Sequence, residues 1–126
     1  MSSQFERTEL LIGKEGIAKL TEARIVVFGI GGVGGYAVEA LARSGVGFID
    51  LFDSDVICLS NLNRQIIATH IASGRYKVDV CKERILDINP QAVVNACRVF
   101  YSQENSNDID LSVYDYVIDA IDTVSS

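Results

Sequence analysis

Four glycines occur within six residues of the chain, in the segment Gly29-Ile30-Gly31-Gly32-Val33-Gly34. We expect Gly29 to allow a tight turn, and Gly31 and Gly32 to leave the backbone open where a phosphate approaches. Gly34 would let a helix pack closely on the preceding strand. The loop therefore predicts phosphate binding at the start of a helix, whose free N–H groups and dipole attract anions. Alone, the motif fits a dinucleotide and ATP equally well.

A carboxylate follows the glycine loop at the spacing expected for ribose binding. Asp53 ends an apolar segment nineteen residues after Gly34. At this place in a nucleotide-binding sheet, a carboxylate accepts hydrogen bonds from ribose hydroxyls. Asp55 fits a supporting role and a solvated turn equally well. Up to this point, an NAD-dependent dehydrogenase is as consistent with the sequence as an ATP-binding protein.

Two cations beyond Asp53 distinguish these alternatives. Arg64 belongs to the segment Ser60-Asn61-Leu62-Asn63-Arg64-Gln65, and Lys77 begins the next predicted helix. Two cations at one edge suit a triphosphate, which carries more charge than a dinucleotide's diphosphate. Each cation alone is typical of a solvated surface, but their association with the glycine loop and Asp53 favours phosphate contacts. An NAD oxidoreductase would leave both without a role.

Two further carboxylates, Asp119 and Asp122, stand at the end of the fourth predicted strand. Open α/β sheets bind ligands at this edge, and carboxylate oxygens are suitable Mg²⁺ ligands. One of the two could therefore hold Mg²⁺ on the phosphates. For Asp119, we prefer the interpretation that it caps the strand end.

Strands and helices alternate along the chain, which is the pattern of a parallel α/β sheet. Short apolar segments predict strands at residues 24–28, 48–52, 92–99 and 114–120. Apolar residues at helical spacing predict helices at residues 15–22, 33–44 and 76–88. We therefore expect a Rossmann-like fold with a mainly parallel sheet and flanking helices. Because a doubly wound sheet normally continues beyond a fourth strand, we expect its C-terminal strands to be missing here.

The composition limits the class of protein. With 126 residues, 48% of them hydrophobic, the chain can bury one core. Its net charge of −6 argues against non-specific nucleic-acid binding. Three cysteines without a CxxC pair, and a single histidine, make a structural zinc site unexpected and suit a reducing cytoplasm. The most apolar stretch, residues 25–38, contains five glycines and is too short for a membrane span.

Five motifs occur in the order typical of one enzyme superfamily. They are a GxGGxG loop, an Asp at a strand end, an NxxRQ element, a Lys on the next helix and a DxxD segment, here at residues 29–34, Asp53, residues 61–65, Lys77 and residues 119–122. In this combination the chain resembles the ubiquitin-activating-enzyme-like adenylation superfamily, which includes the adenylyltransferases of molybdopterin and thiamine synthesis. The resemblance implies that residues 1–126 are the N-terminal nucleotide-binding part of a single adenylation domain.

The resemblance also implies a role for each matching residue. Gly32 would contact ATP through its backbone, Asp53 would bind the ribose, and Asp122 would hold Mg²⁺. Arg7 matches an arginine that reaches the phosphates of the partner subunit's ATP, which implies a homodimer. The residues implied in phosphate contact are Asn61, Arg64, Gln65 and Lys77. Of all these, the ones expected to assist catalysis are Arg7, Arg64 and Lys77.

Within the superfamily, residues 7–13, 40–47 and 82–90 are most similar to the branch that dehydrates threonylcarbamoyladenosine in tRNA. The implied reaction is ATP-dependent adenylation of a carboxylate, followed by ring closure that expels AMP. No protein nucleophile is required for this route. We therefore assign no catalytic role to the cysteines or to His70, and we expect Cys81 to lie in the core.

Two alternatives stay open beside the tRNA dehydratase. The first is an adenylyltransferase that activates the C-terminus of a ubiquitin-like sulfur-carrier protein. Such enzymes usually carry a CxxC zinc pair further along the chain, beyond the residues present here. The second is an ATP-binding fragment without turnover.

Overall fold

The computed structural model of the chain describes residues 6–58, 62, 64–99 and 110–121. Its elements, in chain order, are α1 (Glu6–Glu22), β1 (Arg24–Phe28), α2 (Gly32–Ser44), β2 (Phe48–Phe52), α3 (Lys77–Ile88), β3 (Val93–Cys97), the short 3₁₀ helix η3 (Leu111–Val113) and β4 (Tyr116–Asp119). The described part thus alternates strands and helices as the sequence predicts. The third and fourth strands are shorter at both ends than predicted.

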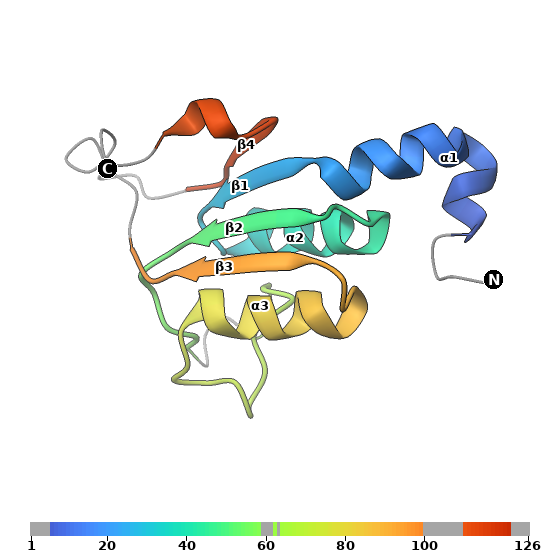
Figure 1. The fold of residues 1–126 in the computed structure, drawn as a ribbon. Helices are drawn as coiled ribbons and strands as arrows, with labels where there is room; N and C mark the ends of the chain where they lie inside the picture. The colour runs from blue at the N-terminus through green and yellow to red at the C-terminus, as the bar shows by residue number, and fades with distance from the viewer. Residues whose placement is uncertain (1–5, 59–61, 63, 100–109, 122–126) are drawn as a thin grey trace.

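The four strands form one sheet in the order β3-β2-β1-β4, and each neighbouring pair is parallel. The arrowheads in Figure 1 accordingly all point to one edge of the sheet. From β1 the chain winds outward through β2 to β3, and it then returns to place β4 on the other side of β1. Open α/β sheets bind ligands where the winding reverses, at the carboxyl ends of the strands. The Rossmann-like arrangement is confirmed, and it points to the carboxyl ends of β1 and β4.

Helices α2 and α3 pack against each other and against one face of the sheet. Every second residue of β1 and β2 faces them and is almost completely buried, as for Ile25, Val27, Ile49 and Leu51. Cys81 of α3 lies in the same core, where burial raises the pKa of its thiol to about 12. The expectation that Cys81 is a core residue is confirmed.

Helix α1 is longer than the helix predicted at residues 15–22. It begins at Glu6 and is kinked at Gly13, whose φ of 76° lies in the left-handed region. Leu10 and Leu11, before the kink, are 83% and 86% exposed. Their consecutive apolar side chains do not follow helical spacing, which is why the pattern did not predict this first part of the helix.

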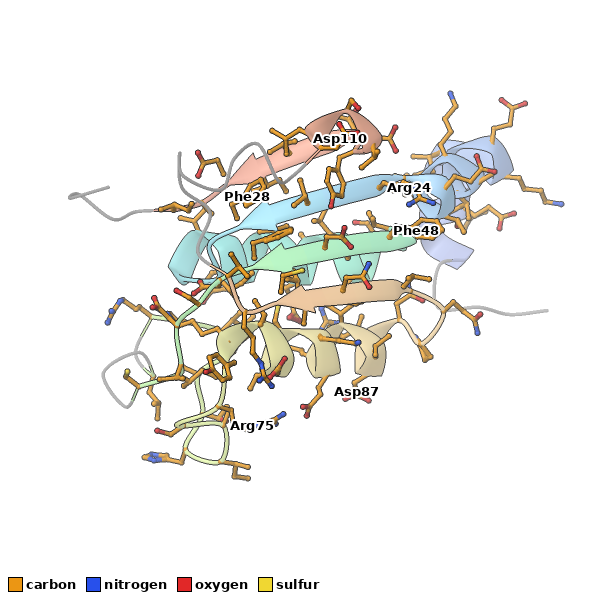
Figure 2. The ribbon with its side chains drawn as sticks, turned by 60° about the vertical axis from the view of Figure 1, so that its left-hand side comes forward. Arg24, Phe28, Phe48, Arg75, Asp87 and Asp110 are labelled. Atoms are coloured by element: carbon orange, nitrogen blue, oxygen red, sulfur yellow. The ribbon has the colours of Figure 1, made fainter. Side chains whose placement is uncertain are left out.

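Polar contacts on the other face of the sheet hold the segment that leads into β4. Asp50 of β2 accepts hydrogen bonds from the Asn95 side chain at 2.8 Å and from the Tyr114 hydroxyl. Asp115 exchanges hydrogen bonds with the backbone of Arg24 at 2.7 and 2.8 Å. Figure 2 shows Arg24 and Phe48 at the amino end of the sheet and Phe28 at the opposite end. These contacts set the register of β4 beside β1, so that its carboxyl end meets the glycine loop.

No helix in the described ranges is long and apolar enough to cross a membrane.

Glu39 of α2 forms an ion pair with Arg84 of α3, and this pair should make the stability of the fold depend on pH. Its carboxylate, 11% exposed, accepts hydrogen bonds from Arg84 at 3.0 Å and Arg43 at 2.9 Å. The Arg84 hydrogen bond is the main cause that lowers the pKa of Glu39. The resulting stability is present above the pKa of about 4.3 that glutamate has when unfolded, and it is lost as the pH falls through the lower folded pKa.

We therefore expect Glu39→Gln to lower the free energy of unfolding by about 1 kcal/mol at pH 7. The difference from the parent protein should shrink below about pH 4, because the parent carboxyl is then protonated as well. Urea unfolding at several pH values measures this. An equal difference at pH 7 and pH 3 would contradict the assignment.

Candidate nucleotide-binding site

Gly29 makes the turn from β1 into the glycine loop in a conformation that suits glycine alone. Its φ is 93°, and its N–H donates to the carbonyl oxygen of Phe52 at 2.9 Å. A Cβ at this position would lie 2.8 Å from the carbonyl oxygen of Ala120, just after β4. The turn is therefore enclosed by the carboxyl ends of β2 and β4, and no larger residue fits it.

The other glycines of the loop divide into two kinds. A Cβ on Gly34 would lie only 1.8 Å from the carbonyl oxygen of Gly29, so α2 rests directly on the turn. Added to Gly31 or Gly32, it would meet protein atoms only at 3.8 and 3.7 Å, which is ordinary contact distance. The fold itself requires Gly29 and Gly34, whereas a Cβ on Gly31 or Gly32 would fit, in contact with the segment of Arg64 and Gln65. The absence of side chains at Gly31 and Gly32 is what close approach of a phosphate to the backbone needs.

Helix α2 begins at this loop without a cap. Its N-cap residue, Gly31, has no side chain, and the first turn contains no acidic residue. The N–H groups of a first helical turn have no partners within the helix, and the helix dipole places partial positive charge there. An anion at this point would bind the free N–H groups.

Asp53 connects the end of β2 to the loop. Its carboxylate is buried, with 7% of the residue exposed, and accepts hydrogen bonds from the N–H of Ile30 at 2.7 Å and of Asp55 at 2.8 Å. Each oxygen keeps a further lone pair, so a ribose hydroxyl can still bind. The bond to Ile30 was not predicted, because it joins residues 23 positions apart. The bond to Asp55 follows a known habit of aspartate in turns.

Gln65 and Arg64, in the connection between β2 and α3, lie beside the glycine loop. Its side-chain nitrogen and the Arg64 carbonyl oxygen are the atoms nearest to Cβ atoms placed on Gly31 and Gly32. Gln65 is only 8% exposed, and its side-chain oxygen has no hydrogen-bond partner among the described residues. A buried amide oxygen is stabilised when it accepts a hydrogen bond. Arg64 itself is exposed.

Lys77 is the first residue of α3 and is 6% exposed. Its backbone N–H donates to the carbonyl oxygen of Asp55 at 3.0 Å, which places the start of α3 next to the turn that Asp53 holds. Within the described ranges, its ammonium group takes part in no hydrogen bond or ion pair. A cation on a residue with so little exposed surface is stabilised by a nearby counter-charge. An anionic ligand would supply one.

Three predicted site residues cannot be placed. Asn61 and Asp122 lie outside the described residues. Arg7 belongs to the first turn of α1, but its side chain is not among those described. Helix α1 begins on the side of the molecule away from the carboxyl edge of the sheet (Figure 1). Mg²⁺ coordination by Asp122 stays a prediction, and the described residues contain no group of three or more potential metal ligands.

The remaining candidate residues lie in turns or at a strand end. Asp119 accepts a hydrogen bond from the N–H of Ile121 at 3.2 Å, which confirms that it caps the end of β4. Asp55 is exposed, its N–H donates to the Asp53 carboxylate, and its carbonyl oxygen accepts from the N–H of Lys77. His70 is exposed in a turn of the long connection between β2 and α3.

This geometry agrees with the family to which the sequence can be assigned. The family model described as "ThiF family" matches residues 5–126. The chain belongs to the ThiF family. Of the five motifs, those that the structure describes, namely the glycine loop, Asp53, Arg64 with Gln65, and Lys77, meet at one edge of the sheet of this ThiF-family chain.

Several proteins resemble this ThiF-family chain along most of its length. The tRNA threonylcarbamoyladenosine dehydratase of Bacillus subtilis is 49% identical over 124 residues, which are 98% of this chain and 49% of that protein. The crystal structure of the Escherichia coli tRNA N6-threonylcarbamoyladenosine dehydratase in complex with ATP has a TM-score of 0.92 and 45% identity, covering 96% of this chain and 50% of that one. The chain therefore spans about half the length of these relatives.

A second group of relatives is named for a different activity. The adenylyltransferase and sulfurtransferase UBA4 of Scheffersomyces stipitis is 37% identical over 105 residues, which are 83% of this chain and 24% of that protein.

Alanine at two positions of the loop should separate folding from ligand binding. Gly34→Ala should destabilise the fold by about 3 kcal/mol, because its Cβ would collide with the Gly29 carbonyl. Gly31→Ala should unfold within about 0.5 kcal/mol of the parent protein but bind ATP at least about tenfold more weakly. Chemical denaturation and titration calorimetry measure the two effects. Undiminished ATP binding by Gly31→Ala would show that phosphates do not approach this part of the loop.

Replacement of Lys77, which has no ion-pair partner among the described residues, should weaken binding without lowering stability. Lys77→Met keeps the length of the largely buried side chain and removes its charge, so its melting temperature should equal or exceed that of the parent protein. ATP affinity should fall by about 10- to 100-fold, as expected for loss of a charged hydrogen bond. Lys82→Met, on the same helix, is the matched control and should bind ATP normally. A destabilised Lys77→Met variant with normal affinity would refute the phosphate role.

Proposed function

We propose that the protein is an ATP-dependent adenylating enzyme that acts on a carboxylate. The observation that carries this proposal is the largely buried residue Lys77, whose ammonium has no ion-pair partner among the described residues, at the sheet edge where α2 begins without a cap. A dinucleotide's diphosphate would use the glycine loop and Asp53 but would leave Lys77 without a partner. A triphosphate extends further and carries more charge, which suits an additional cation.

In the proposed complex, the phosphates meet the glycine loop at Gly31 and Gly32, and the ribose hydroxyls bind Asp53. The side chains proposed to contact the phosphates are Asn61, Arg64, Gln65 and Lys77. The Gln65 nitrogen would donate to a phosphate oxygen, and its side-chain oxygen, which has no partner among the described residues, would accept from a bound water. Mg²⁺, held by Asp122 and the phosphates, would supply further positive charge against the pyrophosphate leaving group.

The proposed chemistry brings two anions together. The substrate carboxylate attacks the α-phosphorus of ATP, the bond to the β-phosphate oxygen breaks, and an acyl-adenylate and pyrophosphate form. Fixed positive groups in a site with little water lower the repulsion between carboxylate and triphosphate. Lys77, Arg64 and the N–H groups of α2 supply such charge from this chain. No cysteine is needed, in keeping with the raised pKa of the Cys81 thiol.

The substrate we favour is the threonylcarbamoyl group on a tRNA adenosine. In this reading, adenylation activates the threonine carboxylate, and a nitrogen or oxygen atom of the same group then attacks it. The ring closes and AMP leaves with the carboxylate oxygen, so that the net change is loss of water. The support is the 49% identity to a relative named for this dehydratase activity. The candidate that we rank second, activation of a ubiquitin-like sulfur-carrier protein, is supported by the lower identity of 37% to an adenylyltransferase and sulfurtransferase.

We further propose a homodimer in which Arg7 reaches the partner subunit's ATP. The support is the start of α1 far from its own site, together with the exposed Leu10 and Leu11, which a second copy could cover. Residues 1–126 would form the nucleotide-binding part of one adenylation domain. Three free cysteines fit a cytoplasmic location, where thiols stay reduced.

A pyrophosphate-release assay tests the proposal and separates the two substrates. Because the chain spans about half the length of its dehydratase relatives, the complete protein is assayed beside the 126-residue chain. We expect release with tRNA that carries threonylcarbamoyladenosine and none with tRNA that lacks it. Release stimulated only by a sulfur-carrier protein would favour the second candidate. ATP binding without turnover of either substrate would leave only an ATP-binding role.

A further inference from the structure

Arg98 links the end of β3 to the first turn of α3. It follows β3 directly, and its guanidinium carbon lies 4.4 Å from the centre of the Tyr76 ring. The same guanidinium donates to one oxygen of Asp79 from Nε at 3.0 Å and from Nη2 at 2.5 Å. Tyr76 is the N-cap residue of α3, and Asp79 is the acidic residue of its first turn. Arg98 therefore contacts α3 on both sides of Lys77 in the sequence.

The first turn of α3 is held from two strands. On the side of β2, Asp55 accepts a hydrogen bond from the N–H of Lys77, and Val56 pairs with Tyr76. On the side of β3, Arg98 supplies the ion pair and the contact with the aromatic ring. With both attachments in place, the direction in which the Lys77 side chain leaves the helix is fixed relative to Asp53 and the glycine loop.

Lys77 needs such an attachment because its position in the helix is unfavourable. A cation at the N-terminus of a helix is repelled by the helix dipole. Asp79 does not neutralise it, since residues two apart on a helix face different directions and the Asp79 carboxylate is bound by Arg98. The first turn thus keeps its ion pair between Asp79 and Arg98, and among the described residues the Lys77 ammonium has no anionic partner.

We propose that Arg98 is a positioning residue for Lys77 and acts on the nucleotide through it. This inference rests on the proposed contact between Lys77 and the phosphates of ATP. The contribution should be modest, because the side chain of Arg98 is 57% exposed and exposed ion pairs are weak. The contact with Tyr76 adds to it and limits the motion of the guanidinium.

The test is a double-mutant cycle on nucleotide affinity. ATP and AMP dissociation constants are measured for the parent protein, Arg98→Ala, Lys77→Met and the double variant. We expect Arg98→Ala alone to weaken ATP binding about two- to fivefold. In the Lys77→Met background, Arg98→Ala should have no further effect, because the residue through which it acts is gone. For each variant, the loss of affinity for ATP is compared with the loss of affinity for AMP. The relative size of these two losses should be the same for Arg98→Ala as for Lys77→Met.

Two further variants test whether the effect is specific to Arg98. Arg75→Ala is the matched control, because Arg75 also forms an exposed ion pair with α3, to Glu83, and lies at the start of the helix (Figure 2). It should leave both affinities unchanged. Arg98→Lys keeps the charge for Asp79 but loses the planar contact with Tyr76, so it should restore part of the ATP affinity.

The outcomes separate this inference from the proposed function. Equal losses from Arg98→Ala with and without Lys77 would show direct contact between Arg98 and the nucleotide, and would overturn the positioning role. Normal affinity in Arg98→Ala, with weakened binding in Lys77→Met, would also overturn it and leave the proposed function intact. Normal affinity in Lys77→Met would instead refute the phosphate role of Lys77, on which both depend.

Discussion

The contact between Gly34 and the carbonyl of Gly29 is the constraint on which the site depends. With no Cβ in between, α2 lies directly on the turn that ends β1, and its first N–H groups are brought to the carboxyl edge of the sheet. The same turn accommodates Ala120 at the end of β4 and is bonded to Phe52 at the end of β2. The ends of three strands and the start of one helix therefore meet at a few backbone atoms. A residue larger than glycine at Gly29 or Gly34 would prevent this close approach.

The sequence alone predicted the first two strands and the glycine loop between them. Strands β1 and β2 were predicted at their observed bounds, because a short apolar segment that stops at glycine or aspartate has few other interpretations. The first part of α1 was not predicted, since Leu10 and Leu11 are exposed and do not repeat at helical spacing. A helix on the surface does not need apolar residues at helical spacing, so the positions of apolar residues do not reveal it.

Residue types predicted candidate side chains for the site but not how these side chains are held. That Lys77 and Gln65 are buried depends on the path of the long connection between β2 and α3, which has no periodic signal. The Arg98 contacts join residues 19 and 22 positions apart, and they arise only when β3 and α3 pack together. Interactions between segments distant in the chain are set by the assembled fold, so they could not be read from local spacing.

The short turn after β2 has a consequence for how a nucleotide is recognised. The Asp53 side chain binds the glycine loop at Ile30, and the Asp55 carbonyl oxygen binds the start of α3 at Lys77, so one short turn contacts both of these segments. A sugar bound to Asp53 would stiffen this turn and with it the surroundings of the phosphates. The binding free energies of the sugar and of the phosphates would then not be additive. Each half of the ligand would bind more tightly when the other half is bound, so the protein would bind the complete nucleotide cooperatively.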